Sequence, residues 1–357
     1  ISIFRHTRSY LVQTVHQGAY DMEIKIENKT IKAYREINRQ IKKIQETTET
    51  VVPDTNDDIG KIVSSSTELF LKSKDVSGSG VVISGEAEIS ILYITEGEDS
   101  VSFVRATKAF RLEYDVEGID KDAVAQIALS VTNSETRILN PRKISVTVEI
   151  SGEMSCFKQE SAITEAALPP SDVTIHTKRE TESAVLINAA CEKTFAFTEQ
   201  FTFPSAKPVP QKIVWQQPAF EIAETQLIGT KALVKGSFRV TVCYLSDSAG
   251  YPVQWSFSAP FSQLLDIGQE KMDMSFARIE ISSAYFDLVD TISGEKALDA
   301  EIHAVLQIVS FFNQELRYVS DAYSNALPLS CKMQQEKVCS VSDVQRMMLG
   351  SEEQISI

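Results

Sequence analysis

The sequence predicts an all-β protein made of tandem repeated, β-sandwich-like units with little helix. Its 357 residues contain an internal repeat, in which Pro53–Val63 aligns with Pro204–Val214 at a displacement of 151 positions. The same displacement carries Val81–Tyr93 onto Ala232–Tyr244 without a gap. Apolar and polar residues alternate within these segments, which is the pattern of a half-buried strand. A long repeat built from such strands indicates repeated β units.

The aligned positions share glycines and aromatic residues as well as apolar character. They include Gly85 with Gly236, Tyr93 with Tyr244, and Phe110 with Phe261. Further along, Arg142–Ile150 aligns with Lys296–Ala304 at a displacement of 154, as if one loop had gained three residues. Loops tolerate such insertions, so both displacements describe one repeat.

Turn signals separate the predicted strands. Gly78-Ser-Gly80 is expected to form a hairpin turn, and Asn140-Pro141 precedes the clearest strand, in which Ile144, Val146, Val148 and Ile150 alternate with polar residues. Long amphipathic helices are not evident, although a short helical turn would fit near Pro53 and near Pro204.

The repeat sets the expected division of the chain. Residues 1–21 match nothing later in the sequence, Pro169-Pro170 marks a linker, and residues 351–357 (SEEQISI) resemble residues 197–203 (FTEQFTF). We therefore expect an arm outside the fold at 1–21, a first β unit at 22–155, a linker at 156–175, a second β unit at 176–313, and a connector with the opening strand of an incomplete third unit at 314–357.

Composition excludes several partners. Lys and Arg number 35 against 49 Asp and Glu, and the resulting net charge of −14 repels nucleic acid. The longest nearly apolar stretch, residues 304–312, is far shorter than the roughly 20 residues of a membrane span. Five cysteines without a CxxC pair suggest neither a disulfide framework nor a zinc site, and favour a reducing cytoplasm.

An ordered set of landmarks resembles the SPOCS-domain family of SipL-like spore coat assembly proteins. ETTETVVPDTNDDIGKIV is followed by a strand ending in ILY, by AFRLEYDVEGI and by NPRKISVTVEI, and the second unit carries similar landmarks. The resemblance extends over about residues 22–357. It implies a sporulation protein of Clostridia and their relatives, located in the mother-cell cytoplasm or the spore coat, whose partner is a spore coat morphogenetic protein.

No residue is assigned a catalytic, cofactor-binding or metal-binding role. His6, His16, His176 and His303 have no catalytic or metal-ligand spacing, and the last two are interpreted as ordinary strand residues. The acidic clusters Asp54/Asp57/Asp58 and Glu96/Glu98/Asp99 lack the spacing of a calcium loop and are interpreted as solvated turns.

The sequence thus favours a non-enzymatic scaffold that binds other proteins through edges and loops. A carbohydrate-binding or cell-envelope module is the alternative, for which Trp215 and Trp255 could form a sugar platform, although a partly buried core aromatic is the favoured interpretation of each. An orphan hydrolase is a third, weaker option. No cofactor is expected, and the oligomeric state stays open.

Overall fold

The computed structural model describes residues 7–17, 22–25, 27–97, 100–167, 175–249, 251–292, 294–325 and 329–338. Every secondary-structure element in these ranges is a β-strand, which confirms the all-β prediction. The segments near Pro53 and Pro204 are single turns closed by hydrogen bonds from Asn56 N to Pro53 O and from Lys207 N to Pro204 O. No helix forms at either place.

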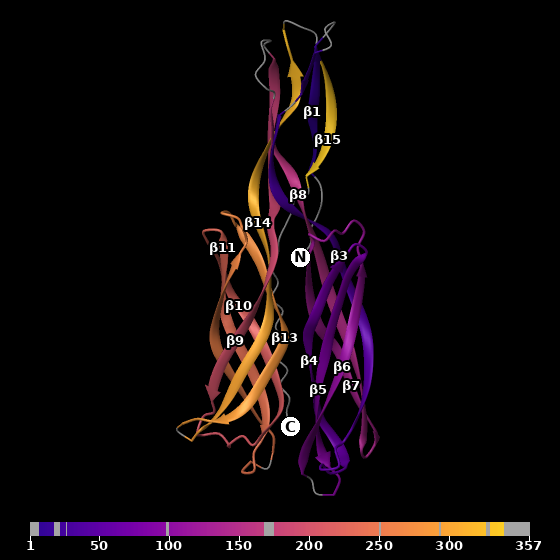
Figure 1. The fold of residues 1–357 in the computed structure, drawn as a ribbon, viewed down its shortest axis with the longest axis vertical. Helices are drawn as coiled ribbons and strands as arrows, with labels where there is room; N and C mark the ends of the chain where they lie inside the picture. Colours follow the sequence, from indigo (N-terminus) through magenta and orange to yellow (C-terminus); the bar gives the residue numbers. More distant parts are fainter. Residues whose placement is uncertain are drawn as a thin grey trace.

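Six strands form the first unit, and they lie in two three-stranded layers (Figure 1). One layer has the order β4-β5-β6 and the other has the order β3-β8-β7. Their bounds are β3 (Glu27–Val51), β4 (Ile59–Ser77), β5 (Gly80–Thr95), β6 (Val101–Asp115), β7 (Val124–Asn140) and β8 (Lys143–Ala167). Tyr93 from one layer and Ile127 and Ile150 from the other share one buried cluster, so the layers enclose a common core.

The second unit has the same strand order. Its layers are β10-β11-β12 and β13-β14-β9. Their bounds are β9 (His176–Thr202), β10 (Lys212–Ile228), β11 (Lys231–Leu245), β12 (Val253–Asp266), β13 (Met274–Asp290) and β14 (Lys296–Tyr323). Hydrogen bonds recur at the displacement read from the sequence: Tyr93 Oη donates to Asp57 O at 3.3 Å, and Tyr244 Oη donates to Pro208 O at 3.1 Å.

The two units lie side by side and are joined by a stem of extended strands (Figure 1). In the stem β14 pairs with β9, β9 with β3, β3 with β8, and β8 with β14, so four strands close into a ring. Leu186, Phe312 and Leu316 pack together in its interior. Closing the ring leaves these strands without a free edge there.

Buried hydrogen bonds tie one unit to the other beneath the stem. The Gln307 side chain, 1% exposed, accepts from Ile127 N at 2.7 Å and donates to Ile127 O at 2.9 Å. Gln126 Nε2 donates to Ile308 O at 2.9 Å. The Gln307 bonds satisfy the N–H and C=O of Ile127 at the edge of β7, and all three bonds fix the position of β7 on β14.

The strands differ from the expected domain limits. Residues 156–167, expected to be a linker, belong to β8 because β3 supplies their backbone partners. In the segment expected to lie outside the fold, β1 (Thr7–Gln17) pairs with β15 (Leu329–Val338) and with β2 (Met22–Lys25). Residues 351–357, on which the expectation of a third unit partly rested, lie outside the described residues. The other expected limits of the two units are still a prediction.

Candidate functional site

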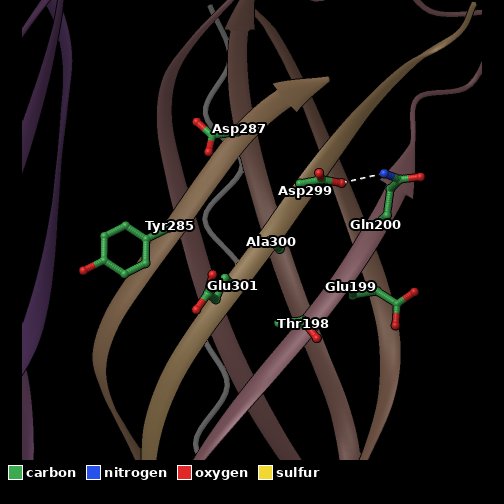
Figure 2. A pocket seen from close by; sticks show the side chains of 8 residues that line it. All are labelled: Thr198, Glu199, Gln200, Tyr285, Asp287, Asp299, Ala300 and Glu301. Carbon is green, nitrogen blue, oxygen red and sulfur yellow. Dashed lines mark hydrogen bonds between the residues drawn. The ribbon is translucent and has the colours of Figure 1, made fainter. Parts of the chain in front are cut away.

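An acidic depression of about 530 Å³ lies on the outer face of the β9-β14-β13 layer (Figure 2). The register brings its residues together from three strands, since Glu301 lies opposite Tyr285 on β13 and opposite Thr198 on β9. Its lining consists of Thr198, Glu199, Gln200, Tyr285, Asp287, Asp299, Ala300 and Glu301. The depression is polar because the side chains of β14 alternate: Asp299 and Glu301 face outward, and the residues on either side of each are buried toward the core.

Four carboxylates and one aromatic ring dominate this depression. Asp299 accepts a hydrogen bond from Gln200 Nε2 at 2.6 Å, and Glu301 Oε1 lies 3.0 Å from His303 Nε2. Tyr285 is 60% exposed and stands at the rim. The surface therefore offers carboxylate oxygens to cationic groups beside an exposed aromatic face, a combination that suits a basic protein segment.

The two acids that β14 contributes to the depression have neutral counterparts in the first unit. At the displacement of 154, Asp299 and Glu301 correspond to Ser145 and Thr147 of the first unit. Thr147 Oγ1 there lies 3.1 Å from Thr47 Oγ1, so a neutral hydroxyl pair occupies the matching place. The sequence analysis missed this site, although the outward parity of these two acids was a visible signal.

The first predicted acidic cluster is tied to an arginine. Arg142 Nη1 lies 2.7 Å from Asp58 Oδ1, and Arg142 Nη2 donates to the carbonyls of Val52 and Pro53. Arg142 also lies 3.5 Å from Asp54. It therefore fixes the turn between β3 and β4 through charge-assisted bonds.

The second cluster is only partly visible, since Glu98 and Asp99 lie outside the described residues. Among the described residues, no group of three or more His, Cys, Asp or Glu side chains is arranged to hold a metal ion. Gly78 and Ser79 form the hairpin turn between β4 and β5, as expected, because Ser77 pairs with Gly80.

The histidines lie apart from one another. His176 begins β9 and stacks on Tyr323, with 5.0 Å between ring centroids, while His303 lies in β14 beside Glu301. His16 belongs to β1, and His6 lies outside the described residues. The two described side chains are thus strand residues with local partners.

The tryptophans do not form a shared platform. Trp215 packs with Leu92 and Phe103 of the first unit, so it belongs to the contact between the units. Trp255 packs against the core of the second unit, and Lys207 Nζ lies 4.7 Å from its ring centroid. Tyr93 and Tyr244 are fully buried and complete the two cores, as the sequence predicts.

The comparison with known proteins finds a family match for part of the first unit. Residues 58–139 match the family model described as SipL, SPOCS domain. This part of the chain is a SPOCS domain. The matched segment holds the whole β4-β5-β6 layer and nearly all of β7, while β3 and β8, which complete the second layer of the first unit, lie outside the match.

The comparisons add nothing beyond this domain. No curated protein and no solved structure matches the chain. In the part of the chain that the structure describes, no helix is long and apolar enough to cross a membrane.

Proposed function

We propose that this protein is a non-enzymatic scaffold of spore coat assembly that binds a spore coat morphogenetic protein at the forespore surface, in the mother-cell cytoplasm. The observation that carries the proposal is the SPOCS domain at residues 58–139. The second unit, with the same strand order, is a second SPOCS-like module in this proposal. Two linked modules strengthen weak contacts by raising the effective concentration of the second one.

The acidic depression is the proposed contact surface. It is open to solvent, which suits a protein surface better than an enclosed small molecule. Its carboxylates would hold lysine or arginine side chains of the partner, and Tyr285 would pack against their aliphatic parts. Contacts of this kind weaken as salt screens the charges.

Biolayer interferometry with the purified spore coat morphogenetic protein tests the proposal. The chain should bind at low salt, and a variant carrying Asp299→Asn and Glu301→Gln should bind at least tenfold more weakly. Glu270→Gln removes an exposed carboxylate in the turn between β12 and β13 and should leave binding unchanged.

Two results would count against this function. Binding that both variants retain would move the contact away from the depression. Absence of binding to the spore coat morphogenetic protein together with saturable binding to glycans on an array would replace the scaffold with the carbohydrate-binding alternative.

A further inference from the structure

Carboxyl groups face one another on the surface that the first unit presents to the second. Glu68 on β4 lies directly opposite Glu88 on β5. Both side chains are partly buried, and the amide of Gln217 on β10 covers this face, donating to Ser66 Oγ at 3.2 Å. Two carboxylates held opposite each other under a neighbouring unit repel one another when both are charged.

The nearest arginine is engaged across the contact. Arg105 Nη2 donates to Ile213 O at 3.0 Å and to Val214 O at 3.3 Å, and Arg105 Nε donates to Val214 O at 3.3 Å. The guanidinium therefore binds carbonyls of β10 and is directed away from a bidentate pair with either glutamate. Burial and the charge of Glu86 raise the pKa of Glu88, and the charges of Arg105 and Lys72 lower it in part.

A third carboxyl lies on the other side of the same contact. Glu280 on β13 is partly buried, and its Oε2 accepts from Leu129 N of β7 at 3.3 Å. Lys74 at this edge binds the carboxylate of Glu192 and donates to Ala125 O at 2.5 Å, so its charge is already used. Glu280 thus enters the contact with one long hydrogen bond, and the charge of Arg278, two positions away on β13, favours its ionised form only in part.

Other charged side chains lie on the strands around the contact, and Glu135 and Arg137 on β7 pair with each other at 2.7 Å. The other strands contribute Lys72 and Lys74 on β4, Glu86 and Glu88 on β5, Arg105 on β6, Glu192 on β9, Lys212 and Glu221 on β10, Arg239 on β11 and Arg278 on β13. Several are paired elsewhere: Lys72 Nζ lies 3.8 Å from Glu86, and Arg239 lies 3.1 Å from Glu221. Lys212 Nζ lies 4.6 Å from the ring centroid of Phe103.

We propose that the contact between the two units is a pH-sensitive joint, closed while Glu68 and Glu280 are protonated and opened as they ionise. The stem keeps the units connected, so opening is a separation of the two lobes below the ring of β14, β9, β3 and β8. Separation returns the carboxylates to water, where the charged form is stable.

The direction in which pH shifts the joint follows from the raised pKa values of Glu68 and Glu280 in the closed state. Burial, followed by the charge of Glu88, raises the pKa of Glu68 to about 8, while Gln217 lowers it in part. Burial raises the pKa of Glu280 to about 7, against the hydrogen bond from Leu129 and the charge of Arg278. The closed state therefore binds more protons than the open one between pH about 4.5 and these values. Over that range each carboxyl favours opening by up to about tenfold per pH unit as pH rises, and the effect levels off above pH 8.

Small-angle X-ray scattering and hydrogen exchange of the full chain from pH 6 to pH 9 test the joint. We expect the radius of gyration to rise with pH, and protection factors of peptides from β7 and β13 to fall at least tenfold. The variant with Glu68→Gln and Glu280→Gln keeps neutral side chains, so it should stay closed throughout. Glu270→Gln removes an exposed carboxylate in the turn between β12 and β13 and should follow the wild type.

The single variants distinguish an effect on the joint from a defect in folding. Glu68→Gln and Glu280→Gln alone should each flatten the pH dependence in part while far-UV circular dichroism stays β-rich. A wild type with constant dimensions and protection over this range would overturn the proposal. A double variant that opens at the same pH as the wild type would overturn it as well.

Discussion

A substitution at Gly85 tests a packing feature that the two units share, a glycine covered by a phenylalanine ring on the neighbouring strand. A Cβ built on Gly85 would lie 2.2 Å from Phe110 Cζ and 2.7 Å from Phe110 Cε1, because the ring of Phe110 covers the glycine from the neighbouring strand. Phe110 is 4% exposed, so the ring cannot move into solvent without opening the core. Gly85→Ala should therefore lower the free energy of unfolding of the first unit by about 1–3 kcal/mol, the usual effect of overpacking.

The control and the double variant separate this clash from glycine effects in general. Gly78→Ala should be nearly neutral, since no atom lies within 4 Å of its Cβ position. Phe110→Ala alone should cost about 3–5 kcal/mol by leaving a cavity. Combined with Gly85→Ala, it should cost less than the sum of both, because the alanine methyl no longer meets the ring.

Urea denaturation followed by far-UV circular dichroism and by hydrogen exchange of β5 measures these effects. Hydrogen exchange of β11, whose side chains fill the core of the second unit, serves as an internal reference and should not change in the Gly85 variant. A Gly85→Ala protein within about 0.5 kcal/mol of the wild type, or strictly additive variants, would refute the argument.

Three further outcomes follow from the contacts. Arg142→Ala should destabilise the first unit by about 1–3 kcal/mol and speed exchange in residues 52–58, because carbonyls of that turn lose a donor, whereas Arg137→Ala, which removes an exposed pair with Glu135, should be nearly neutral. Gln307→Leu should strip both bonds from Ile127 and raise exchange across β7, and unchanged protection there would contradict the bridge between units. Burial raises the pKa of the Cys156 and Cys243 thiols to about 11 and that of Cys191 to about 12, so at pH 8 all three should escape alkylation until urea unfolds the chain, as peptide mass spectrometry can record.

Gly85 and Phe110 also show why the repeat could be recognised from the sequence. Gly236 lies opposite Phe261 just as Gly85 lies opposite Phe110, and a Cβ at Gly236 would lie 2.8 Å from that ring. Each pair occupies adjacent strands, so its geometry depends on local pairing that both units reproduce. Residues whose partners lie within one hairpin leave a pattern that survives in both copies.

The acidic depression and the contact between the units have no such repeated pattern in the sequence. Glu301 and Thr198 meet only because β14 pairs with β9, a strand that lies far earlier in the chain and is separated from β14 by the whole β10-β11-β12 layer and β13. Gln307 and Ile127 are 180 positions apart and come together only when the units dock. Neither distance is encoded in a local alternation of residues.

The sequence by itself determined the all-β class, the displacements of 151 and 154, and the buried positions of each unit, because period-2 alternation and turn residues act within a few positions. Tertiary structure alone decided that β8 and β14 continue past the expected unit limits into a ring, and which polar side chains lie between the units. In those places backbone hydrogen bonds to distant strands, rather than local hydrophobicity, decide where a strand ends and which surface it covers.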